Sequence, residues 1–494
     1  MRTSPAPAAA AASPVIVWFR SDLRLADNPA LHAASAAGQP VIPLYIHDDS
    51  TSGGRALGGA TRWWLHHSLS ALGTALARLG AGQAPAPQLL LWRGRPQEVL
   101  VRLSTASGAR RILCNRTYDP AIDASDAAVA AALRPRGVML ERFAGALLAD
   151  PDTVLSAGRG PMRIFTAFWQ RLQRIEPTAP LPAPRTLPGF DGALGGDRIE
   201  DWELLPRTGW DAQFPARWVP GERGAAARLR EFLKTQADDY RGTRDFPALA
   251  GTSRLSPHLR FGEISARQVW HAFLAAPAGG PAELTGSGFL RELGWREFAG
   301  YTLHHFPTLP ERALRREFAA FPWRDDTHAL AAWQRGRTGY PLVDAGMREL
   351  WQTGWMHNRV RMVVGSFLVK DLLIAWQQGE AWFWDTLVDA DRANNALNWQ
   401  WVSGCGVDAA PYFRIFNPVT QSERFDPEGA YVHAWVPELR ALPAPFVHAP
   451  WTAPPAVLAQ AGVKLGDTYP HPIVVHDEAR KRALALFGAL RQQR

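Results

Sequence analysis

The segment Gly251–Pro257, which reads GTSRLSP, places three hydroxyl side chains and an arginine just before a helical pattern. Backbone N–H groups of small residues at the start of a helix can bind phosphate, and the Arg254 guanidinium would add a positive charge. The same residue types also form an ordinary helix N-cap without any ligand. The segment therefore predicts either a phosphate-binding loop or a plain helix start.

A second group of polar side chains lies within the helical pattern Phe289–Thr302. Glu292, Trp295 and Arg296 are three and four residues apart, so a helix places them on one face. A carboxylate, an indole and a guanidinium together suit a planar heterocycle that needs an N–H acceptor, a stacking surface and a positive charge. A surface ion pair beside a half-buried tryptophan would give the same pattern.

The run TGWMHNRVRM is expected to open a long helix over Trp355–Ala375. On that helix Asn358, Arg361 and Met362 share a face, and Arg359 points about 100° away. An Asn and an Arg that point inward are costly to bury unless they are paired or face a ligand. This face therefore predicts a polar partner or a bound molecule.

The acidic side chains for such a pairing lie in the run Leu387–Asp391. Either Asp389 or Asp391 is the expected partner of Arg361. A divalent metal at these two aspartates is not predicted, because no third ligand and no histidine lies at a usable spacing. We therefore predict no metal site.

Tryptophan is unusually frequent, with 21 residues in a chain of 494. Indole rings are redox-active, so Trp399, Trp376 and Trp323 are candidate stepping stones for electrons, and Trp401 follows in the same segment as Trp399. Taken singly, each of these residues is also explained as part of an aromatic core.

The elements that must position these residues begin with an α/β pattern. Over the first 150 residues short apolar runs alternate with helical patterns, which predicts a doubly wound, largely parallel α/β sheet. No GxGxxG motif follows the first strand, so a dinucleotide bound in the usual Rossmann manner is not predicted. The expected strands are Val15–Arg20, Val41–Ile46, Leu89–Arg93, Arg111–Cys114 and Val138–Phe143, and the expected helices are Thr61–Leu79, Pro96–Ser107 and Ile122–Arg134.

Later in the chain, helical periodicity dominates. Pro, Gly and isolated Trp residues from about Glu176 to Gly224 predict a long connector on the surface. The expected organisation is a disordered tail at 1–13, an α/β domain at 14–150, a connector at 151–224 and an all-α domain at 225–494. Besides the helices named above, we expect Ala225–Gln236, Ser265–Leu274, Leu342–Gln352 and Ala381–Leu387.

The net charge is +8 and the isoelectric point is about 9.8, which favours a polyanionic partner such as nucleic acid. An arginine-rich composition alone would produce the same charge. The only cysteines, Cys114 and Cys405, exclude a disulfide scaffold and suit a reducing cytoplasm. Because no stretch approaches the roughly 18 apolar residues of a membrane span, we expect a cytoplasmic, monomeric protein without a membrane partner.

Several long motifs in order resemble the cryptochrome/photolyase family, and within it the bacterial-type cyclobutane pyrimidine dimer photolyases. The resemblance spans about Val15 to Leu439. It implies an α/β antenna domain followed by an all-α domain that binds FAD in a bent conformation. The segments that carry it are Val17–Arg24, Asp27–Pro29, Gly251–Pro257, Gly354–Met362, Phe367–Leu373, Asp389–Trp401 and Asp408–Pro418.

The resemblance also implies roles for individual residues. Those expected to contact FAD are Tyr240, Thr252, Ser253, Arg254, Leu255, Ser256, Arg296, Asn358, Arg361, Asp389, Asp391 and, at flavin N5, Asn395. Those expected to act in catalysis are Glu292, Trp295, Met362 and Asn395. Those expected to bind DNA are Arg244, Glu292, Trp295, Arg296, Asn358, Arg359 and Trp401. Electron transfer to the flavin is expected through Trp323, Trp376 and Trp399.

The implied activity is light-driven repair of cyclobutane pyrimidine dimers in UV-damaged DNA. An electron passes from reduced FAD to a dimer that is flipped out of the duplex. A 6–4 photolyase is disfavoured, because Asn358 and Met362 stand where that enzyme needs histidines. A cryptochrome light sensor is disfavoured by Asn395 and by the absence of a long tail after Leu439. A nucleic-acid-binding protein without a cofactor would explain the charge but not the motifs.

A second, antenna chromophore of the folate or deazaflavin type is compatible with the family but is not determined by the sequence. The segment Asn115–Asp123 departs from the family's folate-binding pattern, and Phe289 stands where many relatives have Trp.

Overall fold

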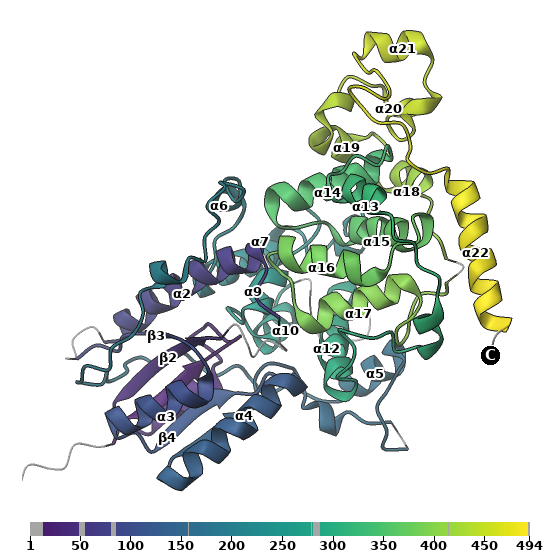
Figure 1. The fold of residues 1–494 in the computed structure, drawn as a ribbon. Coiled ribbons are helices and arrows are strands. Elements are labelled where there is room, and N and C mark those ends of the chain that lie inside the picture. Colours follow the sequence, from purple (N-terminus) through teal and green to yellow (C-terminus); the bar gives the residue numbers. More distant parts are fainter. Residues whose placement is uncertain are drawn as a thin grey trace, which may run out of the picture.

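The computed structural model describes residues 13–492, except 49–54, 81–84, 157, 278, 280–286 and 413. Residues 1–12 of the expected disordered tail lie outside these described residues. The chain forms an N-terminal α/β domain and a larger helical domain that lie side by side (Figure 1). Both predicted fold classes are therefore confirmed.

The α/β domain is built on a five-stranded sheet in the order β3-β2-β1-β4-β5, and all its strand pairs are parallel. All five predicted strands are present, with ends shifted by a residue or less. The strands are β1 (Val15–Phe19), β2 (Val41–His47), β3 (Leu90–Arg93), β4 (Arg111–Asn115) and β5 (Met139–Phe143).

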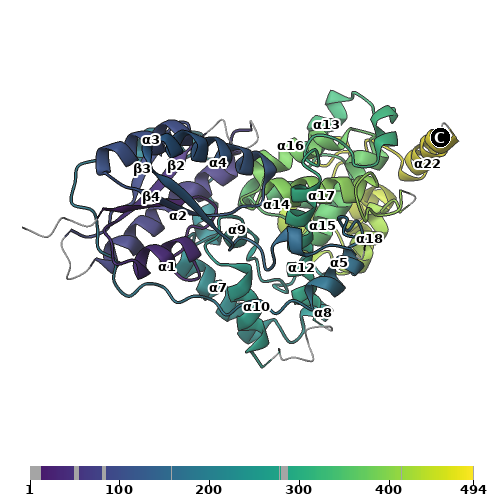
Figure 2. The same cartoon turned by 90° about the horizontal axis from the view of Figure 1, so that it is seen from below.

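Helices cover both faces of this sheet, as the doubly wound prediction requires (Figure 2). Side chains of a strand alternate between the two faces, so Val15, Val17 and Phe19 pack in one core cluster and Ile16 and Trp18 in another. The first cluster includes residues of α1 (Pro29–Ala36) and α2 (Gly59–Leu79), and the second includes residues of α3 (Pro96–Ser107) and α4 (Pro120–Leu133).

The sequence prediction missed helix α1. It begins after Asn28, whose side chain accepts a hydrogen bond from the Leu31 N–H, and Pro29 occupies its first position. An Asn followed by Pro is a helix-start signal. Eight residues are too few to show a clear period, so that signal was the only one available.

The helical domain holds most of the remaining residues (Figure 1). Its helices and those of the preceding segment are α5 (Phe165–Leu172), α6 (Phe214–Arg217), α7 (Glu222–Thr235), α8 (Tyr240–Thr243), α9 (Ser256–Arg260), α10 (Ala266–Leu274), α12 (Gly288–His305), α13 (Thr327–Gln334), α14 (Pro341–Thr353), α15 (Asn358–Ser366), α16 (Trp376–Thr386), α17 (Arg392–Ser403), α18 (Pro418–Phe425), α19 (Ala430–Trp435), α20 (Ala444–Val447), α21 (Pro455–Gln460) and α22 (His476–Gln492). Short 3₁₀ turns lie at Arg134–Arg136, Pro151–Thr153, Ile199–Trp202, Arg316–Ala320, Pro437–Leu439 and Pro450–Thr452.

Helix α5 lies within residues 151–224, the segment expected to form a surface connector. Its residues Phe165, Phe168 and Trp169 are buried in the same apolar cluster as Tyr240 and Phe289 of the helical domain. This part of the segment therefore belongs to the core of the helical domain.

The expected long helix over Trp355–Ala375 is wrong. Helix α15 ends at Ser366, a π-helical turn follows at Phe367–Asp371, and Leu373 has a left-handed φ of 56°. The turn carries two buried charged side chains with specific partners: Lys370 Nζ donates to the Arg414 carbonyl at 2.8 Å, and Asp371 pairs with His476. These tertiary contacts lie outside any helical period, which is why the sequence pattern did not reveal the break.

The two domains are joined by a buried network that we call the N-terminal clasp, formed by Arg24, Asp27, Ser265 and Arg267. Asp27 accepts hydrogen bonds from Arg267 at 2.7 and 3.1 Å and from the Ser265 hydroxyl at 2.5 Å. Arg24 donates to the carbonyls of Asp27 and Gly262 at 2.7–3.1 Å. Arg24 and Asp27 come from the α/β domain and the others from the helical domain, so the clasp fixes one domain against the other.

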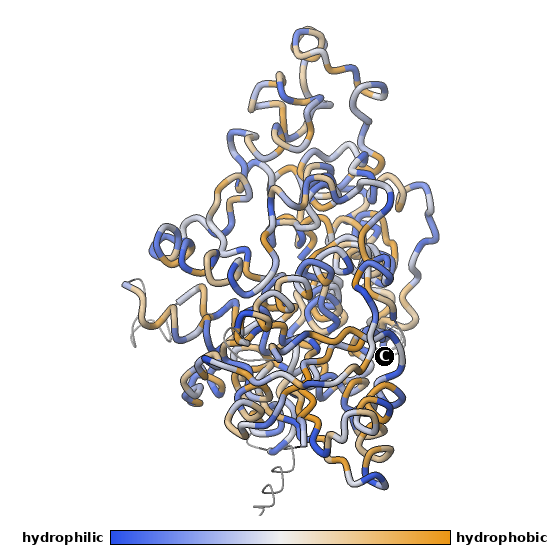
Figure 3. The backbone as a smooth tube through the Cα atoms, turned by 90° about the vertical axis from the view of Figure 1, so that its left-hand side faces the viewer, coloured by the Kyte–Doolittle hydropathy of each residue, from blue (hydrophilic) through white to orange (hydrophobic). Residues whose placement is uncertain are grey.

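Apolar and polar residues are interspersed along the chain (Figure 3). Within the described residues, no helix has both the length and the apolar character needed to cross a membrane.

Candidate cofactor and DNA site

Trp355 lies where the Gly251–Pro257 segment meets helix α15. Its Nε1 donates to the Ser256 hydroxyl at 3.3 Å. The guanidinium groups of Arg254 and Arg361 lie 4.9 and 5.9 Å from its ring centroid. Two motifs that are a hundred residues apart in the sequence are thus brought together around one indole that the sequence analysis did not single out.

The expected partner of Arg361 is confirmed as Asp389, with a 2.8 Å contact between the guanidinium and the carboxylate. The Arg361 Nε also donates to the Met356 carbonyl. Asp391 has a different contact: it caps helix α17 by accepting from the Asn394 N–H at 2.8 Å. Of the two predicted partners, only Asp389 therefore joins this cluster.

Two buried polar atoms of this cluster have no hydrogen-bond partner among the described residues, namely Asp389 Oδ1 and His357 Nε2. Buried polar atoms in folded proteins are almost always paired. Unpaired acceptors and donors beside Arg254 and Arg361 therefore fit a polar ligand that supplies the missing bonds. The phosphates and the ring system of a flavin nucleotide meet that requirement.

Glu349 is a buried residue beside His357 and Arg254, and the sequence analysis did not identify it. Burial raises the pKa of its carboxyl to about 7, although the Tyr431 hydroxyl donates to it at 2.6 Å and Arg254 attracts its charged form. Burial also lowers the pKa of His357 to about 4. We call Arg254, Glu349, His357, Arg361 and Asp389 the cofactor-facing cluster.

The other residues expected to contact FAD surround this cluster at different depths. Leu255 is buried, and its N–H donates to the Ser253 hydroxyl at 3.4 Å. Tyr240 packs against Phe232 and Phe289, and burial raises the pKa of its hydroxyl. Thr252 and Met362 are half-buried, and Asn358 is exposed.

Asn395 is buried on helix α17, where its side-chain amide contacts Glu380 of helix α16. Its Nδ2 donates to the Glu380 carbonyl at 3.0 Å and to the Glu380 carboxylate at 2.7 Å. Among the described residues, no hydrogen bond involves the Asn395 Oδ1. Glu380 is thus a further site residue that the sequence analysis missed, because it lies 15 residues away on a separate helix.

A second group joins helix α12 to the Tyr240–Thr243 helix and to α15. Glu292 accepts from Arg244 at 2.7 Å, and Asp245 lies 2.9 Å from Arg359 and 3.9 Å from Arg244. The Arg359 guanidinium also covers the Phe425 ring at 4.3 Å. The structure therefore assembles three residues expected at a DNA surface, and it adds Asp245 between their two positive charges.

Trp295 lies near Glu292 on helix α12, as predicted, and it is half-buried. Its indole stacks on Phe165 with centroids 3.8 Å apart and planes 7° apart. The Arg291 guanidinium also lies over the Phe165 ring, at 4.8 Å. One face of Trp295 is therefore backed by α5, a contact that residue spacing along α12 could not predict.

Arg296 does not join Glu292 and Trp295 in one constellation, as the sequence pattern suggested. It pairs with Glu297 at 2.8 Å and reaches toward the Ala146 carbonyl of the α/β domain at 3.4 Å. It lines a cavity of about 160 Å³ between the domains that Asp391 also lines. The helix places these residues three and four apart, but the neighbouring carbonyl and carboxylate draw the long Arg296 side chain toward the other domain.

The tryptophans expected to carry electrons belong to one apolar cluster in the helical domain. Trp376 and Trp399 are buried within it, and Trp323 packs against it from a half-buried position. Trp399 has ring contacts with Phe383 at 5.0 Å and with Trp333 at 6.2 Å, and Trp323 contacts Phe321 at 4.4 Å. Trp401 is half-buried at the edge of the same cluster.

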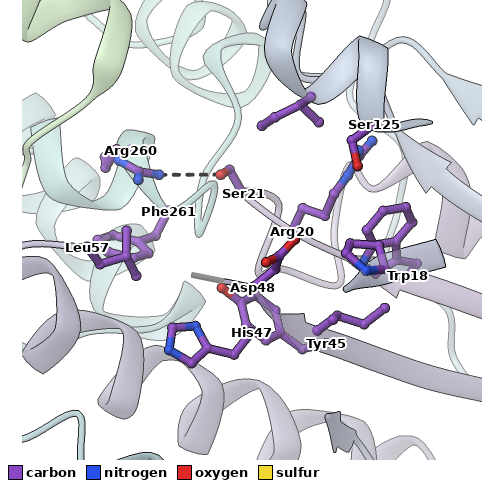
Figure 4. Close-up of a pocket in the computed structure, with 13 residues that line it drawn as sticks. Trp18, Arg20, Ser21, Tyr45, His47, Asp48, Leu57, Ser125, Arg260 and Phe261 are labelled. Atoms are coloured by element: carbon purple, nitrogen blue, oxygen red, sulfur yellow. Dashed lines mark hydrogen bonds between the residues drawn. The ribbon is translucent and has the colours of Figure 1, made fainter. Parts of the chain in front are cut away.

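A separate pocket opens at the carboxyl ends of β1 and β2 in the α/β domain (Figure 4). It lies beside the point where the chain order reverses between β1 and β4, the usual place for ligands in such sheets. Arg260 reaches it from the helical domain and donates to the Ser21 hydroxyl at 3.3 Å. Its aromatic and charged lining residues are Trp18, Arg20, Tyr45, His47, Asp48, Arg260 and Phe261.

One group of three potential metal ligands occurs among the described residues, Asp152, His304 and His305. His304 Nε2 already contacts the Asp152 carboxylate at 2.9 Å, and His305 Nε2 contacts the Pro151 carbonyl at 3.3 Å. These contacts account for the group as a connection between the end of α12 and the Pro151–Thr153 turn.

An α/β domain joined to a helical domain whose charged cluster has unpaired polar atoms defines a two-domain protein with a place for a polar ligand. Two family models match the chain: "DNA photolyase" over residues 15–185 and "FAD binding domain of DNA photolyase" over residues 289–489. The chain belongs to the cryptochrome/photolyase family, and its helical domain contains the family's FAD-binding domain.

Individual relatives agree with this assignment. The chain is 48% identical to the deoxyribodipyrimidine photo-lyase of Agrobacterium fabrum over 97% of its own length and 98% of that protein. It is 39% identical to cryptochrome-1 of Arabidopsis thaliana over 94% of its own length and 69% of that protein. The crystal structure of a class III photolyase from Agrobacterium tumefaciens superposes with a TM-score of 0.94 at 47% identity, covering 99% of this chain and 100% of that one.

Proposed function

We propose that this protein is a deoxyribodipyrimidine photo-lyase that uses light to split cyclobutane pyrimidine dimers in DNA. The observation that carries the proposal is the pairing of a ligand-facing charged cluster around Trp355 with a second cluster of Glu292, Arg244 and Arg359. The photo-lyase of Agrobacterium fabrum matches nearly the whole chain at 48% identity, against 39% for cryptochrome-1 of Arabidopsis thaliana.

FAD would be held mainly by the cofactor-facing cluster and by the Gly251–Pro257 segment. Thr252, Ser253 and Ser256 offer hydroxyl and backbone donors to the phosphates, with Arg254 balancing their charge. Asp389 Oδ1 and His357 Nε2 would gain the partners that they lack. Further contacts are proposed from Tyr240, Leu255, Arg296, Asn358, Arg361, Asp391 and Asn395.

The bound cofactor, when fully reduced and excited by light, supplies an electron to the dimer and takes it back after the ring opens. Glu292 would accept an N–H from the pyrimidine edge and so hold the dimer in place during the transfer, an electrostatic role. Trp295 would stack on the dimer with the face that Phe165 does not cover, and Met362 would fill the space beside it. Asn395 would present its carbonyl oxygen to flavin N5 and accept a hydrogen bond from the N–H there.

DNA would lie against the Arg244 and Arg359 side of the helical domain. Arginines that contact phosphates supply affinity without sequence preference. Asn358 and Trp401 are proposed to contact the flipped dimer and its flanks, together with Arg296. Flipping costs a few kcal/mol, and least for a damaged pair that is already poorly stacked.

Trp399, Trp376 and Trp323 are proposed to pass electrons from the surface to the flavin. Their burial supports this order, because Trp399 and Trp376 are buried and Trp323 is more exposed.

The pocket of Figure 4 is proposed to hold a second, light-gathering chromophore. Trp18, Tyr45 and Phe261 offer aromatic faces, and Arg20 and Arg260 suit an anionic ring system. An archaeal photolyase with 29% identity and a TM-score of 0.81 is described as holding two FAD molecules. We propose further that the protein works as a cytoplasmic monomer.

The deciding experiment is an illuminated repair assay on DNA that carries one defined cyclobutane dimer. A 6–4 product and a dark sample serve as controls. We expect repair of the dimer in light only, and Glu292→Ala should lower the repair per absorbed photon several-fold with a smaller loss of binding. Absence of light-dependent repair in the parent protein would reject the proposal.

A further inference from the structure

The orientation of the Asn395 amide is set by Glu380. Both of its hydrogen bonds to Glu380 use Nδ2, at 3.0 Å to the carbonyl and 2.7 Å to the carboxylate. An amide nitrogen can only donate, and a carboxylate can only accept. The charged Glu380 therefore fixes which end of the Asn395 amide is free, and the free end is the carbonyl oxygen.

Glu380 is in turn held by Arg55, a residue of the α/β domain. The Arg55 Nη1 lies 2.8 and 2.7 Å from the two carboxylate oxygens of Glu380. The Glu380 side chain is only 6% exposed, whereas that of Arg55 is 36% exposed. The Arg55 guanidinium also lies over the Trp384 ring, at 4.6 Å. A buried carboxylate of the helical domain thus receives its counter-charge from the other domain.

The backbone around Arg55 is anchored on the same helix, α16. Trp384 Nε1 donates to the Ala56 carbonyl, and the Gly59 N–H donates to Asp385, both at 2.8 Å. A Cβ at Gly58 would lie 2.1 Å from the Trp384 carbonyl oxygen, so only glycine allows this approach. Arg55 is therefore delivered to Glu380 by a docked segment at the start of α2 and not by a free surface chain.

We propose that Arg55 is a positioning residue for flavin reduction, which acts from the α/β domain through Glu380 to hold the Asn395 carbonyl toward flavin N5. This inference rests on the proposed placement of Asn395 at N5. Reduction adds a proton at N5. A carbonyl oxygen oriented toward N5 can accept a hydrogen bond from that N–H, and the oxidised cofactor has no such N–H to donate. Arg55 would thereby favour the reduced form that repair requires.

Loss of Arg55 should disfavour the reduced flavin whichever way Glu380 responds. Burial raises the pKa of Glu380, while Arg55 and the Asn395 amide lower it. If Glu380 stays charged without Arg55, an unbalanced negative charge near the flavin opposes electron uptake. If Glu380 takes up a proton, it becomes a donor as well as an acceptor and no longer fixes the amide.

The test is the midpoint potential of the bound flavin in intact holoprotein, followed by absorbance during an anaerobic redox titration. We expect Arg55→Ala to lower the ratio of reduced to oxidised flavin about tenfold at a given potential, a shift of about 30 mV for the two-electron couple. Arg55→Lys keeps the charge and should recover part of the shift. Arg348→Ala is the matched control, because it removes an arginine with two contacts of 2.7–2.8 Å to another carboxylate, Glu438, and should leave the potential unchanged.

A double-mutant cycle shows whether the effect passes through Asn395. In an Asn395→Ala background, Arg55→Ala should cause a clearly smaller shift, because only the unbalanced charge of Glu380 then still acts on the flavin. If that variant does not retain flavin, Glu380→Gln provides the alternative background, with the same expectation. A change of less than threefold in the single variant, or an equal shift in both backgrounds, would overturn the proposal.

These outcomes are independent of the repair assay. A parent protein that fails to repair dimers but shows the Arg55 shift would reject the proposed function and retain the role of Arg55. A parent protein that repairs dimers, with no shift of the potential in Arg55→Ala, would support the proposed function and reject the role of Arg55.

Discussion

The N-terminal clasp and the cofactor-facing cluster are both buried networks of Arg and Asp that join distant segments, yet they differ in how completely they are satisfied. In the clasp, both carboxylate oxygens of Asp27 and all three guanidinium nitrogens of Arg24 have protein partners. In the cluster, Asp389 Oδ1 and His357 Nε2 have no partner among the described residues. A network in which every polar atom has a protein partner indicates a structural contact, and a network with unpaired polar atoms indicates a place for a ligand.

This difference separates motifs that look alike in the sequence. The runs Val17–Arg24 and Asp389–Trp401 both carry arginine and aspartate beside aromatic residues, and both contributed to the family resemblance. Only the hydrogen-bond partners show that Arg24 holds the domains together, while one carboxylate oxygen of Asp389 is left without a partner among the described residues.

The largest effect is expected from Asp27→Asn, which keeps the shape of the side chain and tolerates its left-handed φ of 52°. It leaves Arg267, whose side chain is only 13% exposed, without a counter-charge, so the free energy of unfolding should fall by about 3–5 kcal/mol. Urea unfolding of the flavin-free protein measures the loss. The affinity for FAD of the protein that remains folded should stay within about threefold of the parent. A stable Asp27→Asn protein with weak FAD binding would contradict the structural assignment of the clasp.

The next effect concerns Glu349, whose buried carboxyl has a pKa of about 7 in the folded protein. The folded state then binds more protons than the unfolded state between the ordinary glutamate pKa of 4.5 and about 7, so the free energy of unfolding falls as the pH rises through that window. Glu349→Gln stays neutral and should remove this loss, a gain of about 3 kcal/mol above pH 7. Unfolding of flavin-free parent and variant at pH 5, 6, 7 and 8 measures the difference. If the free energy of unfolding depends on pH in the same way in parent and variant, the charge of Glu349 is compensated by other groups of the protein.

A smaller effect on stability, but a specific effect on the cofactor, is expected from Asp389→Asn. It is the same kind of substitution as Asp27→Asn, made in the cofactor-facing cluster. The free energy of unfolding of the flavin-free protein should change by less than about 1 kcal/mol, because Arg361 is partly exposed and can be hydrated. The affinity for FAD should fall about 10- to 100-fold, since a ligand contact and the partner of Arg361 are weakened together. Flavin release measured by fluorescence tests this, and unchanged affinity would remove the distinction between the two networks.

The smallest expected effect is on the salt dependence of DNA binding, and it distinguishes two mostly buried arginines. Arg359 and Arg348 have side chains that are each 17% exposed, and each pairs with one acidic residue. Arg359→Ala should flatten the dependence of log affinity for DNA on log salt by about one unit, for damaged and undamaged DNA alike. Arg348→Ala, which removes the pair with Glu438, should leave the slope unchanged. Equal slopes in the parent and the Arg359 variant would place Arg359 away from the phosphates.

Much of the fold was predictable because it follows from local periodicity. The five strands, helices α2–α4 and, after residue 220, helices α7, α10, α12 and α14 could be placed to within a few residues, since each buries one face with a regular period. That Arg361 pairs with Asp389 or Asp391 was also predictable, because an inward arginine requires a nearby acid, but only the structure showed that the partner is Asp389. The break after Ser366 was not, because its cause lies in partners such as His476 that are distant in the sequence.

The same limit applies to the site. Phe165 backs Trp295, and Arg55 holds Glu380, yet no spacing rule connects residues 130 or more positions apart. The role of Glu349 depends on burial, which a single sequence does not reveal. Motifs thus indicated candidate residues for contacts with the cofactor and the substrate, while the side chains that hold those candidates in place emerged only from the folded structure.

The contact between Arg55 and Glu380 can form only late in the synthesis of the protein. The two residues are 325 positions apart, and Arg55 is made first. At roughly 5–20 residues per second, a ribosome needs about 15–65 s to travel from one to the other. If Arg55 sets the Asn395 amide, a growing chain cannot complete its flavin environment during that interval. Because Asp389 and Asn395 follow Glu380 in the chain, the proposed flavin contacts and the contact with Arg55 both become possible only at the end of that interval, when the α/β domain has already been made.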